Sequence, residues 1–324
     1  MGRIFIDGFE SGNLALWNVI GGVTVTAAQT GMDDVYNASF ATNVVYLERS
    51  LPSKSEVYAA FRLRLSNIST PYSYMIAFKN ASTNIGCLRI NPAYYLEVSR
   101  GTTYLATGPT LSLNTTYKIE IRFKPHNTDG VFQVKVNGLL VIDFSGDTTD
   151  GATTIDNIRF GYPATNYGFL GYLDNVVIDD TSWPGDTRIK GILPAGVGNS
   201  SQWTPSAGSN YACVDEVPPS DADYVTTNTV GNKDTYAAGD LPADASSVKC
   251  VQFAARAQKE GAATPQNLAF VIRTGGMDYE GSGVVLPTTF TEHVRDLWVN
   301  NPATSQAFTP SEVNGMEIGI KAAA

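Results

Sequence analysis

The sequence predicts an all-β protein with two domains in series, and three observations lead to this prediction. The chain has 324 residues, which exceeds the length of one typical domain. Its 30 glycines and 16 prolines, with only 16% charged residues, are typical of many turns between short strands. Alternating apolar and polar residues recur along the chain, and only one short segment has a helix pattern. We therefore expect an antiparallel β-sandwich over residues 1–183 and a smaller β-sandwich with one short helix over residues 184–324.

Strand patterns fill the first domain. Residues 57–65 and 117–123 alternate apolar and polar side chains, which buries one face of each strand and leaves the other in water. Asn137-Gly138 separates two such runs and predicts a hairpin, because both central residues of a type I′ turn need a positive φ. This spacing, without an interrupting helix, favours two packed antiparallel sheets. Further short strands are predicted at residues 74–78, 88–90, 94–98, 155–161 and 171–179.

The second domain begins at the seam Trp183-Pro184-Gly185, after which glycine and proline become frequent and periodic runs disappear. One helical turn is predicted at residues 309–314, because Thr309 can cap it, Pro310 fits its first position and Glu312 completes a capping box. The remainder indicates a small β-sandwich. Its strand patterns lie at residues 247–257, 266–273, 294–300 and 315–321.

Composition excludes several classes of partner. The formal net charge is −9 and lysines and arginines do not cluster, so we expect neither nucleic-acid binding nor attraction to anionic membranes. No apolar run approaches the roughly 20 residues that span a bilayer, so no membrane insertion is expected. The first ten residues lack the apolar stretch and cleavage site of a secretory signal, which predicts synthesis in a cytoplasm.

The residue types that carry out chemistry are sparse. Cys87, Cys213 and Cys250 are an odd number at wide spacing, which predicts buried thiols, although a bridge between Cys213 and Cys250 stays open. His126 and His293 are the only histidines and fall in different domains, so no Ser-His-Asp triad can be assembled. Glycoside hydrolysis needs two carboxylates flanking the scissile bond, and no strand offers such a pair. We therefore predict that the chain is not an enzyme.

The first half resembles the concanavalin A-like, laminin G-like jelly roll. The resemblance rests on the opening residues 5–17, on the hairpin over residues 134–144 and on the closing residues 171–179. It implies that the first and last strands pair, which brings Asp7 and Glu10 near Asp174. Several jelly-roll modules bind a structural Ca²⁺ there through carboxylate and carbonyl oxygens. The resemblance thus implies a possible Ca²⁺ site at these three residues, whereas acids at strand ends more often only face water.

The same resemblance implies carbohydrate binding, because jelly rolls often hold sugars against aromatic rings. Hydroxyl groups of a sugar could then bond to Asn84, Asn91 and Asn166. Against this, tyrosines with apolar rings and wet hydroxyls are common on half-exposed strands. The candidate ligand-binding residues are Tyr72, Tyr74, Tyr94, Tyr95, Tyr162 and Tyr167.

The second half resembles structural modules of tailed-bacteriophage virions. This implies a component of the virion, made in the host cytoplasm, that decorates the capsid or attaches to the tail. The expected partners are major capsid or tail proteins, further copies of the chain in a homo-oligomer such as a trimer, and host surface glycans. The resemblance rests on residues 185–189, 193–194, 202–205, 210–211, 214–219, 223–225, 233–236, 273–276 and 301–302.

An alternative function belongs to a different class. The chain could instead be a free carbohydrate-binding protein, or a degraded glycanase, released at lysis. Weak sugar sites gain strength from multivalent display on a particle, whereas a free lectin needs tight binding by one copy. The sequence does not separate a head position from a tail position.

Overall fold

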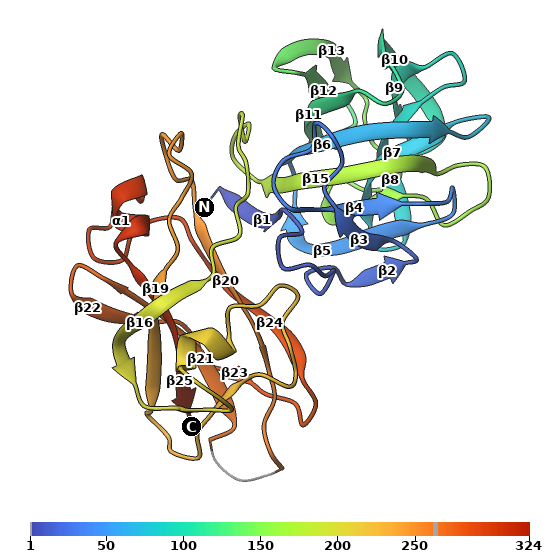
Figure 1. Cartoon of the computed structure of the whole chain (residues 1–324). Helices are drawn as coiled ribbons and strands as arrows, with labels where there is room; N and C mark the ends of the chain where they lie inside the picture. The colour runs from blue at the N-terminus through green and yellow to red at the C-terminus, as the bar shows by residue number, and fades with distance from the viewer. Residues whose placement is uncertain (1, 262–264) are drawn as a thin grey trace. The chain divides into compact units, whose positions relative to one another are not determined.

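The computed structural model describes residues 2–261 and 265–324 (Figure 1). The chain divides into two compact units, Met1–Ile189 and Lys190–Ala324. Nearly all regular structure in both units is β, which confirms the predicted fold class. The first unit extends beyond the predicted seam because two backbone N–H groups after it donate to first-unit side chains. Gly185 donates to Glu120 Oε1 at 3.1 Å, and Ile189 donates to Asn175 Oδ1.

Two antiparallel sheets form the first unit (Figure 1). The eight-stranded sheet has the order β13-β12-β11-β6-β15-β4-β3, and β1 also pairs with β15. Its strands are β1 (Arg3–Asp7), β3 (Thr24–Ala27), β4 (Tyr36–Phe40), β6 (Val57–Ile68), β11 (Thr116–Lys124), β12 (Gly130–Val136), β13 (Leu139–Gly146) and β15 (Phe169–Asp179).

The seven-stranded sheet has the order β10-β9-β8-β7-β14-β5-β2. Adjacent strands here are often distant in sequence, as when β14 inserts between β7 and β5. This order determines which side chains can meet on the sheet's surface. Its strands are β2 (Val19–Gly21), β5 (Tyr46–Lys54), β7 (Ser73–Asn80), β8 (Thr83–Ile90), β9 (Tyr95–Arg100), β10 (Thr103–Thr110) and β14 (Ile155–Gly161).

The core of the first unit lies between the two sheets. Phe61 of β6 contacts Phe160 of β14 with ring centroids 5.0 Å apart, and Phe78 of β7 stacks on Phe123 of β11 at 4.9 Å. Each pair joins one sheet to the other, and all four rings are buried. Packing of two inner faces in this way is the sandwich arrangement that the alternation predicts.

Two predictions for the first unit are confirmed: the hairpin at Asn137-Gly138 and the pairing of the first strand with the last. Asn137 and Gly138 have φ values of 50° and 83°, as the hairpin between β12 and β13 requires. The first and last strands pair as the resemblance implies, with Asp7 opposite Val176. The sequence did not indicate β5 or β10, in which proline or glycine interrupts the alternation.

The second unit contains a six-stranded sheet of order β16-β19-β25-β21-β22, with β23 paired to β21. Two further pairs, β17 with β18 and β20 with β24, complete it. Its core includes Phe253, Phe270, Ile272 and Phe308. The strands are β16 (Pro194–Ser201), β17 (Thr204–Pro205), β18 (Val225–Thr226), β19 (Lys233–Ala238), β20 (Val251–Ala257), β21 (Asn267–Thr274), β22 (Met277–Glu280), β23 (Val284–Val285), β24 (Thr291–Trp298) and β25 (Glu317–Ala323).

The predicted helical turn is confirmed as α1 (Pro310–Asn314). The Thr309 side chain accepts from the Glu312 N–H at 3.2 Å, and the Glu312 carboxylate accepts from the Thr309 N–H at 2.7 Å. A 3₁₀ turn, η1 (Asn210–Cys213), also occurs. None of the described helices has the length and apolar character needed to span a bilayer. No disulfide links the three cysteines.

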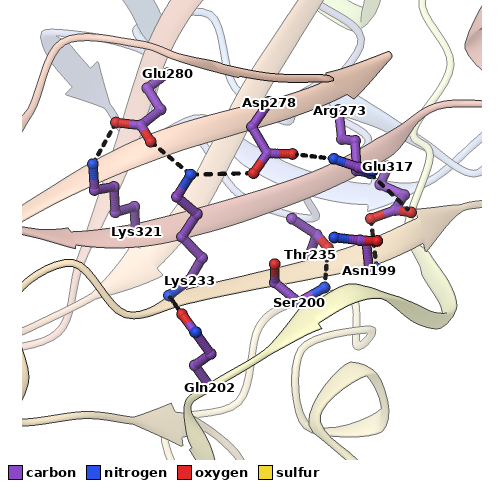
Figure 2. A network of polar contacts seen from close by, with 10 residues as sticks. All are labelled: Asn199, Ser200, Gln202, Lys233, Thr235, Arg273, Asp278, Glu280, Glu317 and Lys321. Atoms are coloured by element: carbon purple, nitrogen blue, oxygen red, sulfur yellow. Dashed lines mark hydrogen bonds and ion pairs between the residues drawn. The ribbon is translucent and has the colours of Figure 1, made fainter. Parts of the chain in front are cut away.

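One face of the six-stranded sheet carries a network of ion pairs across four strands (Figure 2). Lys233 of β19 and Lys321 of β25 are register partners, so two like charges lie side by side. Glu280 of β22 bridges the two lysines, because one of its carboxylate oxygens accepts from Lys233 at 2.8 Å and the other accepts from Lys321 at 2.6 Å. Asp278 likewise joins Lys233 to Arg273. These cross-strand ion pairs stabilise the strand order of the sheet.

We expect Glu280→Gln to lower the free energy of unfolding by about 1 kcal/mol, because Lys321 loses its carboxylate partner and Lys233 keeps only Asp278. Urea titration at low salt measures the loss. In 1 M NaCl the difference should shrink, since salt screens half-exposed charges. Glu260→Gln, at an exposed position of the same unit, is the control. Equal losses at both salt concentrations would contradict the electrostatic explanation.

Candidate functional site

The six predicted tyrosines all lie at one end of the seven-stranded sheet. Tyr72 directly precedes β7, whose Ser73 pairs with Ile90 at the end of β8. Tyr94 ends the turn from β8 into β9, and Tyr95 is the first residue of β9. Tyr162 follows the last residue of β14, and the Tyr167 carbonyl accepts from the Tyr74 N–H at 2.8 Å. The structure therefore brings together segments that are up to 95 positions apart in the sequence, from Tyr72 to Tyr167.

Four of these residues, Tyr72, Tyr74, Tyr162 and Tyr167, form the tyrosine cluster. Tyr74 stacks on Tyr162 with centroids 4.7 Å apart, and Tyr167 lies 5.6 Å from Tyr162 and 6.1 Å from Tyr74. The rings pack on Ala77 and Cys87, whose small side chains face outward from the sheet. Tyr74 is buried, and the other three are half-buried. The tyrosine rings therefore cover a part of the sheet that carries the small side chains of Ala77 and Cys87.

A polar row borders the tyrosine cluster. Arg89 of β8 is the register partner of both Tyr74 and Glu97, and its Nε donates to Glu97 Oε2 at 3.1 Å. Its guanidinium also lies 3.8 Å from the centroid of the Tyr72 ring, a cation–π contact. Asn91 Nδ2 donates to Glu97 Oε1 at 2.8 Å. Arg89, Asn91 and Glu97 therefore hold one another in place beside the rings.

Burial changes the protonation of two groups at the cluster. It raises the pKa of the Tyr74 hydroxyl, an effect that the hydrogen bond and positive charge of Arg89 oppose. It also raises the pKa of the Cys87 thiol to about 12, so this thiol is neutral at physiological pH. Cys87 is therefore an unreactive thiol against which the tyrosine rings pack.

A second group of charged residues, which the sequence analysis missed, lies on the same outer face. Glu48 of β5, Lys79 of β7 and Arg159 of β14 form the charged cluster. Lys79 Nζ donates to Glu48 Oε1 at 2.9 Å, and Arg159 bonds to the same oxygen. Arg159 also lies over the Tyr46 ring at 5.4 Å. Each of the three charged residues stands in a strand segment and can be found in the sequence. Only the strand order β7-β14-β5 brings the three together.

Other candidate sugar-binding residues lie apart from the cluster. Tyr94 and Tyr95 are exposed at the β8–β9 turn, where Asn91 Oδ1 accepts from the Tyr95 N–H at 3.1 Å. Asn166 is exposed in the segment between Tyr162 and Tyr167. Asn84 lies at the opposite end of β7 and β8, opposite Lys79. The site therefore consists of the tyrosine cluster with Asn91 and Asn166 nearby, and without Asn84.

The three predicted metal ligands have separate partners. Asp7 Oδ1 accepts from the Phe9 N–H and its Oδ2 accepts from Trp17 Nε1, both at 2.7 Å. Glu10 Oε1 accepts from the N–H groups of Val35 and Tyr36. Within residues 2–261 and 265–324, no group of three or more His, Cys, Asp or Glu side chains is placed to hold a metal ion. The Ca²⁺ site stays a prediction from the family resemblance.

Asp174 differs from the other two acids because its Oδ2 is buried without a hydrogen-bond partner. Its Oδ1 accepts from the Asn175 N–H at 2.6 Å. Burial raises the pKa of Asp174 to about 8, and the negative charges of Glu10 and Asp33 add to the effect. Burial also raises the pKa of Asp7 to about 7, against the opposing influence of its two hydrogen bonds.

Comparison with known proteins shows similarity in fold only. No protein-family model matches the chain, and no curated protein matches its sequence. Among solved structures, a sialidase matches 56% of this chain at 15% identity, with a TM-score of 0.39. This match spans 19% of the sialidase. An endo-β-1,4-glucuronan lyase from Trichoderma reesei matches 55% of this chain and 96% of its own, at 15% identity and a TM-score of 0.39.

A third similar structure is domain 4 of a GH43 extracellular arabinanase from Geobacillus stearothermophilus, solved with arabinotriose. It matches over 55% of this chain and 93% of that domain, at 12% identity and a TM-score of 0.39. By their titles, these proteins are a sialidase, a glucuronan lyase and an arabinanase domain bound to arabinotriose. At this level of similarity they share the sandwich and assign no activity to the chain.

These matches correct the prediction that the chain is not an enzyme. The sialidase, the glucuronan lyase and the arabinanase are enzymes by their titles, so the prediction that the chain is not an enzyme is not upheld. The sequence argument tested for paired carboxylates, which is the requirement of glycoside hydrolysis alone. Other ways of cleaving a polysaccharide lay outside that test.

Proposed function

We propose that the first unit binds a glycan at the tyrosine cluster. The stacked rings of Tyr74, Tyr162 and Tyr167, held at one end of the seven-stranded sheet, carry this proposal. Binding sites for small ligands combine an apolar, often aromatic, surface with a few fixed polar groups. Sugar rings match such a surface because their C–H faces are apolar while their rims carry hydroxyl groups.

The polar row supplies the fixed groups. Arg89 and Glu97 are nearly buried and hold each other, so little side-chain entropy is lost when a ligand binds. Asn166 lies in the exposed segment between Tyr162 and Tyr167, and Tyr94 and Tyr95 are exposed at the adjacent turn. A ligand that covers the cluster therefore has donors and acceptors on its border. The attachment to a phage particle stays a prediction from the second half.

Binding by the full chain to a broad glycan array, followed by calorimetry on the best ligand, tests the proposal. We expect Tyr162→Ala and Tyr167→Ala each to weaken binding about fivefold, because each removes a ring contact worth about 1 kcal/mol. Both residues are half-buried and belong to the segment after β14, so their truncation spares the core.

Tyr224→Ala is the matched control, since Tyr224 is an exposed tyrosine of the second unit. Its affinity should equal that of the unmodified chain. Failure to bind any glycan would overturn the proposal. Unchanged affinity in both cluster variants would place the binding site elsewhere.

A further inference from the structure

The charged cluster contains more hydrogen-bond donors than acceptors. Arg159 directs Nε and Nη2 to Glu48 Oε1, and Lys79 uses the same oxygen. The two N–H groups of Arg159 Nη1 and two of the three donors of Lys79 have no acceptor among the described residues. Buried and half-buried polar groups are normally bonded to protein, water or a ligand. This cluster therefore favours an additional acceptor.

The charge balance of the cluster favours an anionic acceptor. Two cations share one carboxylate, so one positive charge has no counter-ion within the cluster. Burial alone would raise the pKa of Glu48, but hydrogen bonds from Lys79 and Arg159 outweigh it and hold that pKa below its ordinary value. Glu48 is thus already ionised. A further anion would balance the remaining charge.

Arg159 is the member of the charged cluster that lies next to the proposed glycan site, whereas Lys79 lies toward the other end of β7. Arg159 is the register partner of Ala77, on which the tyrosine rings pack, and Tyr162 follows the same strand. The Arg159 side chain is 13% exposed, against 4% for that of Lys79, so Arg159 is the more accessible cation.

Among the described residues, no acid other than Glu48 makes an ion pair with Arg159 or Lys79. Glu97 is already paired with Arg89. Asp150 lies against Gly101 beyond the end of β9, and its negative charge acts on Cys87 beneath the tyrosine rings. The donor surplus is therefore located at Arg159 and Lys79.

We infer that the glycan bound at the tyrosine cluster is acidic and that a uronic-acid carboxylate is bound by Arg159, with Lys79 adding positive charge. This inference rests on the proposed function. A guanidinium group suits a carboxylate because its planar N–H donors match the two carboxylate oxygens. Tyrosine rings would contact the neighbouring sugar face.

The test compares each acidic oligosaccharide with its own carboxyl-reduced form. Oligogalacturonate, oligoglucuronate and alginate oligosaccharides are titrated into the full chain by calorimetry, before and after reduction of the carboxyl groups to alcohols. We expect at least one acidic form to bind tenfold or more tightly than its reduced form. The difference should shrink between 50 mM and 500 mM NaCl, because salt screens the charge.

Arg159→Lys keeps the charge and removes the Nη1 donors, so it should lower the affinity for the acidic form tenfold or more. Arg122→Lys, which alters an ion-paired arginine on the eight-stranded sheet, is the matched control and should bind as the unmodified chain does. Thermal melting of both variants shows whether the fold is retained. Glu48→Gln, which increases the net positive charge, should tighten binding of the acidic form.

Three outcomes would overturn the inference. Equal affinity for acidic and reduced forms would overturn it and leave glycan binding intact. Binding of sulfated oligosaccharides without binding of uronates would overturn the assignment of a carboxylate. Absence of binding to acidic and neutral glycans alike would overturn the proposed function as well.

Discussion

Asp234→Ala is expected to lower the free energy of unfolding of the second unit by about 4 kcal/mol. Asp234 is completely buried in β19. Its Oδ1 accepts from the N–H groups of Gln202 and Trp203 at 2.7 and 2.8 Å, and its Oδ2 accepts from Asn210 and from the Tyr236 hydroxyl. Alanine leaves the Trp203 N–H, one Asn210 N–H and the Tyr236 hydroxyl without this acceptor, whereas the Gln202 N–H keeps the Lys233 carbonyl. Each such loss costs roughly 1–3 kcal/mol, and the losses are less than additive because the donors partly relax.

This prediction is measured by hydrogen exchange of peptides covering residues 202–213 and by urea titration. Asp234→Asn should lose about 2 kcal/mol, because an amide keeps one acceptor oxygen but turns an N–H₂ group toward donors. The matched control is Asp240→Ala, an exposed aspartate of the same unit, which should change stability by less than about 0.5 kcal/mol. Wild-type protection of residues 202–213 in the alanine variant would show that Asp234 does not organise this segment.

The strands were predictable from the sequence wherever alternation was regular. β6 and β11 each pack one face on the core, so their apolar residues recur at every second position, whereas the alternation of β15 shifts at the bulge between Asp174 and Val177. β16 was missed because it contains Gly196 and Gly198 and exposes Val197, which removes the periodic signal. β19 was missed because three consecutive residues, 234–236, are buried, which removes the alternation and places polar Asp234 at a buried position.

The candidate site was predictable in composition and not in arrangement. The sequence shows where the tyrosines are but not which of them make contact. Those contacts form because the start of β7, the end of β14 and the segment before β15 come together. Glu48, Lys79 and Arg159 come from three strands that are far apart in the sequence and adjacent in the sheet. Strand order therefore had to be known before the charged cluster could be recognised.

Asp174→Asn is expected to stabilise the first unit at alkaline pH. The pKa of Asp174 is about 8 in the folded protein, against an ordinary value of 3.8, because the group is buried near Glu10 and Asp33. The folded protein therefore binds this proton more tightly than the unfolded chain does. Its stabilising contribution is fully present below about pH 4, decreases from there, and is lost as the pH rises through 8. Asparagine keeps the acceptor for the Asn175 N–H and has no proton to lose.

Urea titration of the first unit between pH 5 and pH 8, in EDTA, measures this effect as the difference between the unmodified chain and the variant. That difference should grow by about 1.4 kcal/mol for each pH unit, since one bound proton separates the folded and unfolded states. Asp129→Asn, at an exposed position of the same unit, should follow the unmodified chain. Parallel curves for the unmodified chain and Asp174→Asn would show that the carboxyl group is already ionised in the fold. If calcium raises the stability of the unmodified chain and not of the variant, the charge of Asp174 is balanced by a cation, as the family resemblance implies, and not by a proton.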